Sequence, residues 1–76
     1  MIEFHYGPKS DIATIGWKTP DRSRIVRDVL VNHGGSEIHL GFSEQGNLVE
    51  IEIQDASHVF AQDVLDAALP MDERLS

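Results

Sequence analysis

The amino-acid sequence predicts an α+β fold, in which a small antiparallel (meander-like) sheet of about five strands carries one C-terminal helix packed on one face. Three observations support this expectation. Apolar and polar residues alternate with a period of two in several short segments, which is typical of half-buried strands. Residues that favour turns separate these segments. An apolar stripe at helical spacing follows them, and a helix laid on one face of a sheet buries both apolar surfaces.

The length of 76 residues predicts a single domain, which we place at residues 1–70, followed by a flexible tail at residues 71–76. A chain this short hides a limited share of its surface on folding, so self-association would add stability. There is no cysteine, so disulfides and thiolate metal sites are excluded.

The chain is strongly acidic, because 13 Asp and Glu residues against 6 Lys and Arg residues give a formal net charge of −7. Such a field repels a phosphate backbone, so we expect no direct nucleic-acid binding. An acidic surface favours solubility, and it also complements a basic protein partner. No apolar run approaches the ~20 residues that span a bilayer, and the N-terminus lacks a signal-peptide pattern. We therefore expect no membrane contact and a cytoplasmic location.

Two strands are expected first, close enough in sequence to form a hairpin. Residues 2–6 alternate between apolar and polar, and Pro8 ends this strand because it lacks an N–H group. Residues 11–17 form the second strand, and core packing is the main expectation for Trp17, with an interface role as the alternative. The polar residues 18–23 are predicted to be a loop.

The segment at residues 24–32 fits two interpretations. Its apolar residues recur at helical spacing, and Gly34 would suit the end of a helix. However, four of its five apolar residues are β-branched, which favours a strand. Residues 32–35 also make a good turn into the next strand. We therefore predict a strand.

Residues 36–43 and 47–54 alternate most clearly and predict a central hairpin. A two-residue loop at residues 45 and 46 predicts three cross-strand pairs: Phe42 with Val49, Leu40 with Ile51, and Ile38 with Ile53. A slip of one residue would turn one strand's apolar side chains into water, so the pattern enforces the register. At about 1.5–3 kcal/mol for each buried side chain, this hairpin is expected to contribute most to the core.

A helix is predicted to begin at His58, with the Ser57 side chain as its N-cap and Asp55 as the alternative cap. Its apolar stripe consists of Phe60, Ala61, Val64, Leu65, Ala68 and Leu69. Pro70 is expected to end it.

Two segments resemble the small bacterial family called domain of unknown function 2283. Residues 6–15 read YGPKSDIATI and residues 46–57 read GNLVEIEIQDAS. The positions that match the family pattern are Tyr6, Asp11, Ile15, Gly46, Ile51, Glu52, Ile53, Ala56 and Ser57. The positions that depart from it are Gly7, Thr14 and Glu50. The resemblance covers about residues 2–60, supports a strand at residues 24–32, and implies no established activity. An association of relatives with small toxin-like proteins would imply an antitoxin-like role.

The four histidines show no spacing that is typical of a metal site. His39 and Glu52 are expected to face each other on the outer face of the central hairpin, and a simple cross-strand pair is the main interpretation. Asp11 and Asp55 are explained by turn and cap roles. We assign no catalytic, cofactor-binding or metal-binding residue and no cofactor. The candidate interaction positions are His39, Glu52, Glu50, Asp11 and Trp17.

The leading hypothesis is a small non-enzymatic interaction module that binds another protein or a second copy of itself. An antitoxin-like role toward a basic partner is its sharper form. The alternative is a small metal-binding protein or enzyme that uses an exposed pair, His39 and Glu52.

Overall fold

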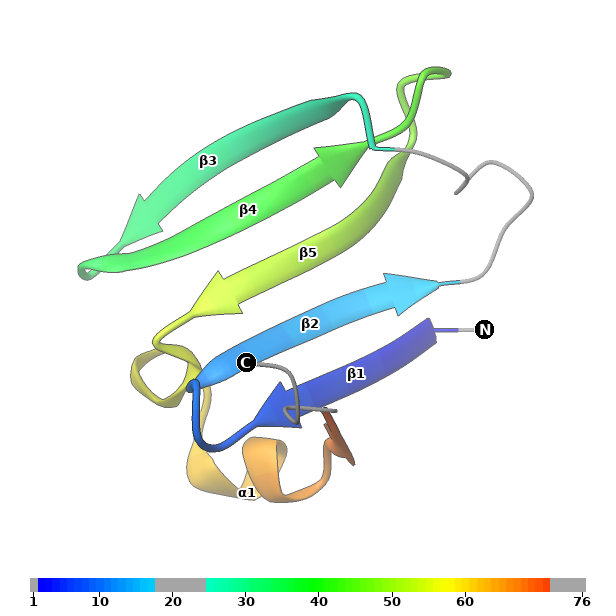
Figure 1. Cartoon of the computed structure of the whole chain (residues 1–76). Coiled ribbons are helices and arrows are strands. Elements are labelled where there is room, and N and C mark those ends of the chain that lie inside the picture. Colours follow the sequence, from blue (N-terminus) through cyan, green and yellow to red (C-terminus); the bar gives the residue numbers. More distant parts are fainter. Residues whose placement is uncertain (1, 18–24, 72–76) are drawn as a thin grey trace.

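The computed structural model describes residues 2–17 and 25–71, so the expected loop at residues 18–23 and residues 72–76 of the expected tail lie outside the described residues. The described chain forms six strands, one short α-helix and one 3₁₀ turn (Figure 1). In chain order, these elements are β1 (Ile2–Gly7), β2 (Ile12–Trp17), β3 (Arg27–His33), β4 (Ser36–Phe42), β5 (Leu48–Gln54), η1 (Ala56–His58), α1 (Gln62–Asp66) and β6 (Leu69–Pro70). The strands form one sheet in the order β3-β4-β5-β2-β1-β6.

The sheet differs from the expected one because it has six strands and is mixed. All neighbours among β1 to β5 are antiparallel, but β6 runs parallel to β1, with Leu69 beside His5 and Pro70 beside Tyr6. The Met71 N–H extends this contact by donating to the Tyr6 carbonyl at 3.1 Å. A strand of two residues that includes a proline has no readable period, so the sequence does not predict it.

The segment at residues 24–32 contributes a strand, and the helical interpretation is wrong for its described part. β3 covers Arg27–His33 and pairs with β4 along its whole length. Gly34 and Gly35 connect the two strands with φ angles of 59° and 88°. Two successive positive φ angles match the right-handed twist of a hairpin, and glycine adopts them at low cost.

The central hairpin has the predicted register over most of its length. Leu40 pairs with Ile51 and Ile38 with Ile53, as the alternation indicates. The predicted pair of Phe42 with Val49 is wrong, because Phe42 faces Leu48. An irregularity between Gly41 and Phe42 shifts the register there. Such a bulge places one extra residue in one strand, which a strict period of two does not predict.

The predicted long helix is also wrong. Residues 56–58 form η1, Ala61 is extended with φ −64° and ψ 152°, and α1 spans only Gln62–Asp66. Ser57 lies inside η1, and the residue before η1, Asp55, makes no side-chain capping bond. Only part of the apolar stripe is buried: Leu65 of α1 is buried and the Phe60 ring packs against Phe4 with centroids 5.3 Å apart, but Ala61, Val64 and Leu69 are exposed. The two short helical elements η1 and α1 therefore bury part of the apolar surface that one long helix was expected to bury.

The core lies on one face of β2 and β5, under η1 and α1. Its buried cluster consists of Ala13, Ile53, Ala56 and Leu65. Figure 1 shows η1 and α1 at the end of the sheet where β1 ends and β2 begins, with β3 and β4 at the far side of the sheet. The helical elements therefore cover only part of one face. No helix among residues 2–17 and 25–71 is long and apolar enough to cross a membrane.

Candidate interaction surface

The face of the sheet opposite the core carries a group of charged residues on β3, β4 and β5. We call this group the acidic face, and it consists of Asp28, Glu37, His39, Glu50 and Glu52. These residues alternate in their strands with the core-facing residues, so they share the outer face. Asp28 and Glu37 are exposed, and the other three are half-buried.

His39 lies between two of these carboxylates. Its Nδ1 is 2.9 Å from Oδ2 of Asp28, and its Nε2 is 3.4 Å from Oε1 of Glu37. A protonated imidazole donates from both nitrogens, so the two carboxylates favour the charged ring. The bond to Asp28 raises the pKa of His39 most, and partial burial opposes this. The bond to Glu37 and the charges of Asp28 and Glu52 raise the pKa further, so it lies above its ordinary value.

The predicted placement of His39 opposite Glu52 is correct, but their relationship is indirect. The two residues pair in the β4–β5 register. The imidazole bonds to Asp28 and Glu37, and Glu52 acts on it through charge. No group of three or more metal-ligating residues in the described part of the chain could hold a metal ion.

Asp28 is a partner of His39 that the sequence analysis missed. The β3–β4 register places Leu30 opposite His39, and Asp28 lies two residues away on the same face. This diagonal distance is within reach of long side chains. The turn at Gly34 and Gly35 could have predicted this contact, because counting back from the turn gives the register between β3 and β4.

Glu50 stands between two glycines, because Gly16 of β2 and Gly41 of β4 are its neighbours in the sheet. Trp17 is half-buried at the end of β2 opposite Ile2, whose side chain is 73% exposed. The β4–β5 register places Glu50 diagonally from His39 on the same face, whereas the strand pairing does not bring Trp17 close to His39.

Asp11 occupies a different site, at the end of the β1–β2 hairpin. We call it the Asp11 staple, because the Asp11 carboxylate joins the hairpin to η1. Tyr6 Oη donates to Oδ1 at 2.7 Å, the Ser57 N–H donates to Oδ1 at 3.0 Å, and Ser57 Oγ donates to Oδ2 at 2.6 Å. The Ala56 N–H also donates to the Asp11 carbonyl at 2.9 Å. Asp11 has a φ of 58°, which aspartate tolerates better than most residues.

The charged form of Asp11 is favoured by this arrangement. Burial raises the pKa of the carboxyl group, but the bonds from the Ser57 side chain, Tyr6 and the Ser57 backbone lower it. The nearby charge of His58 lowers it too, and the resulting pKa lies below the ordinary value. Four positions of the resemblance (Tyr6, Asp11, Ala56 and Ser57) thus meet in one structural contact, which explains these residues without a catalytic role.

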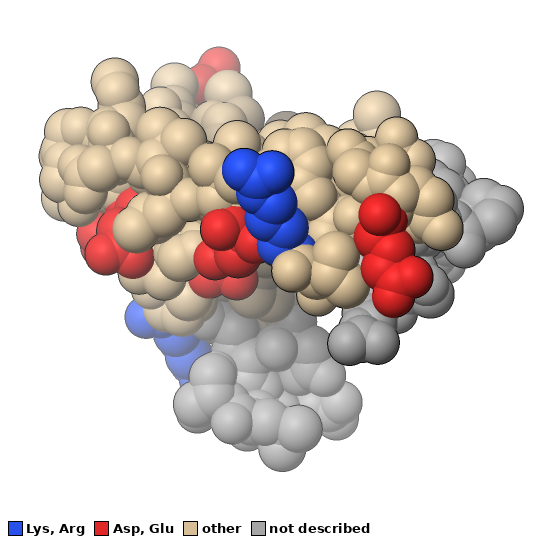
Figure 2. Space-filling model, turned by 90° about the horizontal axis from the view of Figure 1, so that it is seen from above, with Lys and Arg blue, Asp and Glu red and all other residues tan. Residues whose placement is uncertain are grey.

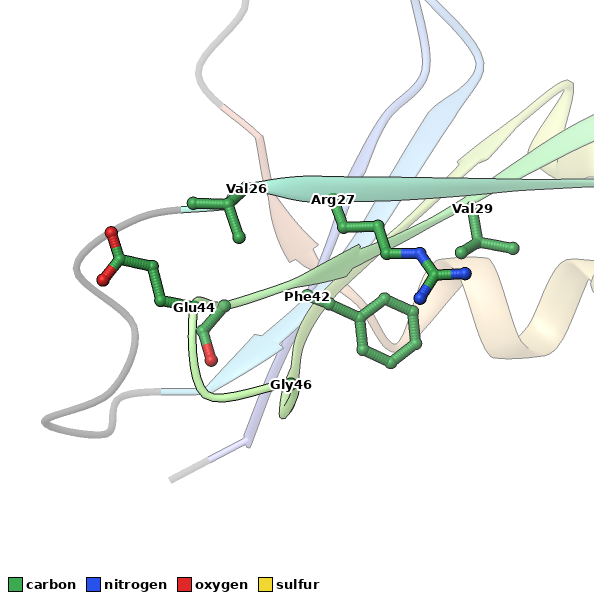
Figure 3. Close-up of a pocket in the computed structure, with 7 residues that line it drawn as sticks. Val26, Arg27, Val29, Phe42, Glu44 and Gly46 are labelled. Atoms are coloured by element: carbon green, nitrogen blue, oxygen red, sulfur yellow. The ribbon is translucent and has the colours of Figure 1, made fainter.

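A hollow of about 390 Å³ lies at the other end of the molecule, and the sequence analysis missed it. It is lined by Val26, Arg27, Val29, Phe42, Ser43, Glu44 and Gly46. Figure 3 shows Arg27, Val29 and Phe42 projecting to the same side of the β3 ribbon. Arg27 and Phe42 are paired in the β3–β4 register, and Phe42 lies at the irregularity of the β4–β5 register, which the sequence pattern does not predict.

A family model described as "Protein of unknown function (DUF2283)" matches residues 3–57. No curated protein and no solved structure matches the chain.

Proposed function

Because the chain belongs to the DUF2283 family of proteins of unknown function, we propose its role from its geometry: it is a non-enzymatic module that binds a basic protein through the acidic face. One observation carries this proposal. Four carboxylates of β3, β4 and β5 share one outer face of the sheet, and the basic side chain that bonds to two of them is that of His39.

The charge of this face suits a protein partner. Carboxylates that share one surface create a field that steers a basic protein toward it and opposes acidic competitors. The formal net charge of −7 extends this field beyond the face itself. An antitoxin-like role, in which the basic partner is a small toxin, is the sharper form of the proposal.

The shape of the face also favours binding over catalysis. Acid–base catalysis requires a concave site that excludes water and perturbs the carboxylates. The carboxylates of the acidic face stand on a strand surface, and the hollow of about 390 Å³ is lined by core-facing side chains such as Val29 and Phe42.

The test is affinity capture from the native cell with a variant that carries Glu37→Gln, Glu50→Gln and Glu52→Gln. We call it the charge-neutral variant, because these three positions of the acidic face then carry no charge, while Asp28 keeps its own. The matched control is Glu44→Gln, Asp63→Asn and Asp66→Asn, which removes the same number of charges away from the face. We expect the wild-type protein and the control to retain a specific basic protein, with an affinity that falls as salt rises, and the charge-neutral variant to lose it. Retention by the charge-neutral variant, or equal loss by the control, would contradict a role for this face.

The alternative, a metal-binding protein or enzyme that uses His39 and Glu52, has less support, because the described residues contain no group of three or more side chains that could hold a metal ion, and Glu52 acts on His39 through charge. Metal analysis of the purified protein tests it, with His39→Ala and Glu52→Ala as variants. Stoichiometric zinc or iron that both substitutions abolish would establish the alternative and replace the binding proposal.

A further inference from the structure

Strand β3 forms one edge of the sheet, and β4 separates it from the carboxylates of β5. We propose that β3 pairs antiparallel with β3 of a second copy of this chain, about a two-fold axis at Leu30, so that the two sheets become continuous. This inference does not rest on the proposed basic partner, because it uses the strand edge and not the carboxylates of Glu37, Glu50 and Glu52.

The open edge of β3 provides the hydrogen-bonding groups. β3 is the first strand of the sheet, and its one neighbour among the described strands is β4. In a hairpin with a two-residue turn, the closing pair, here His33 and Ser36, exchanges backbone hydrogen bonds. Alternate residues then face away from β4, so the N–H and C=O groups of Asp28, Leu30 and Asn32 point to the open edge. These groups form a ready template for another strand.

The side chains of this edge are unusually apolar. Leu30 is 56% exposed on the outer face, and Val31 is 42% exposed on the core-facing side. Figure 2 looks down on the side of the molecule that carries β3, and uncharged residues make up most of its described surface, with charged side chains scattered among them. Soluble proteins usually protect an edge strand with lysine, proline or inward-pointing charge. The centre of β3 reads Val29-Leu30-Val31 and carries none of these.

A two-fold axis at Leu30 is the register that matches the apolar residues of β3. Leu30 then faces the partner's Leu30, and Val29 faces the partner's Val31. An axis at Val29 would place Leu30 against the partner's Asp28, and an axis at Val31 would place it against the partner's Asn32. An axis at Asp28 would oppose two like charges, which destabilises a sheet. Apolar pairing therefore selects the Leu30 register.

Charge and hydrogen bonding agree with this register. β3 contains one arginine and one aspartate, so it is formally neutral in a chain of net charge −7, and two copies meet there with little repulsion. The Leu30 register also places Asn32 opposite the partner's Asp28. The Gly35 N–H donates to Oδ1 of Asn32 at 3.3 Å, which leaves the Asn32 amide group to donate across the interface. Oδ2 of Asp28 is 2.9 Å from Nδ1 of His39. The second carboxylate oxygen of Asp28 can therefore accept the hydrogen bond that the partner's Asn32 donates.

A ladder from a seven-residue strand is smaller than a standard protein interface, so we expect a reversible dimer. Sedimentation of the full chain over a wide concentration range tests it, with Leu30→Lys as the disrupting variant. The matched control is Val64→Lys, because Val64 is 40% exposed on α1 and receives the same charge. We expect wild type and Val64→Lys to shift from monomer to dimer, and Leu30→Lys to remain monomeric with an unchanged circular dichroism spectrum. A wild-type chain that stays at 8.5 kDa throughout, or a Leu30→Lys variant that dimerises like wild type, would overturn the proposal.

Single cysteines test the register, since the natural chain has none. In a hydrogen-bonded antiparallel pair the Cα atoms are about 5.5 Å apart, within the range of a disulfide. Mild oxidation should therefore cross-link Leu30→Cys faster than Asp28→Cys or Asn32→Cys, whose counterparts in the partner lie farther away. Fastest cross-linking at residue 28 or 32 would refute the Leu30 register. Two outcomes separate this inference from the proposed function. The charge-neutral variant would lose the basic partner but still dimerise, and Leu30→Lys would lose dimerisation but keep the basic partner.

Discussion

Ser57 donates its hydroxyl hydrogen to the carboxylate of Asp11 at 2.6 Å, although the two residues are 46 positions apart in the sequence. The Ser57 N–H binds the other carboxylate oxygen at 3.0 Å. One side chain of the β1–β2 turn therefore fixes the start of η1, and with it the path of the chain after β5. Both residues lie within the region that the family model matches, residues 3–57, and Ser57 is its last residue.

Asp11→Asn should destabilise the protein by about 1–2 kcal/mol, because it removes a charged acceptor from a partly exposed site. Asparagine tolerates the positive φ of this position, so the backbone is not expected to change. Urea unfolding measures the effect. Ser57→Ala should cost a similar amount, and the double variant should cost less than the sum of the two. Strict additivity would mean that the two side chains do not interact.

The Asp11 carboxyl should also contribute to acid denaturation. Its pKa is lower in the folded protein than its ordinary value of 3.8, so the unfolded chain binds the proton more readily. The ionised Asp11 carboxylate therefore stabilises the fold fully above the pKa that Asp11 has in the unfolded chain. This stabilisation is lost as the pH falls through the pKa of Asp11 in the folded protein. Unfolding curves from neutral pH into the acid range should show a smaller loss of stability for Asp11→Asn than for wild type. Parallel curves would assign the acid sensitivity to other groups.

His39 should titrate above its ordinary pKa of 6.5, because Asp28 and then Glu37 hold its protonated form. The protonated His39 ring therefore stabilises the fold fully below the pKa that His39 has in the unfolded chain. This stabilisation is lost as the pH rises through the pKa of His39 in the folded protein. An NMR titration of the ring protons measures it. Asp28→Asn should lower the midpoint more than Glu37→Gln does. An unchanged midpoint in Asp28→Asn would show that the ring does not bind this carboxylate in solution.

Gly34→Ala should cost about 1–2 kcal/mol, because a side chain at a φ of 59° meets its own backbone. An added Cβ would meet no other atom within 4 Å, so the effect is one of backbone conformation. Gly34→Asn is the matched control and should cost clearly less, since asparagine is common at this position of such turns. Thermal unfolding of the two variants compares them, and equal losses would indicate that the turn is not strained by a side chain.

The local pattern of the sequence determined the strands and most of their pairing. Alternation predicted the pairs of Leu40 with Ile51 and Ile38 with Ile53, because one side of each strand must leave water. It also predicted that His39 lies opposite Glu52. The β-branched residues and the glycine pair predicted β3, because both act within a few residues of chain. These features depend on interactions between sequence neighbours or across one tight turn.

Tertiary structure alone decided the rest. The bulge at Phe42, the extended residue Ala61 and the short strand β6 each break a period, because packing against distant residues outweighs local propensity there. The same reason explains Ser57. The local sequence predicts that its side chain caps a helix, but its N–H and its hydroxyl group donate hydrogen bonds to the Asp11 carboxylate instead. A capping serine oxygen accepts a hydrogen bond from the first turn of its helix, whereas Ser57 donates both its N–H and its hydroxyl hydrogen to Asp11. Only the folded chain, in which residue 11 comes to lie beside residue 57, determines which of the two forms.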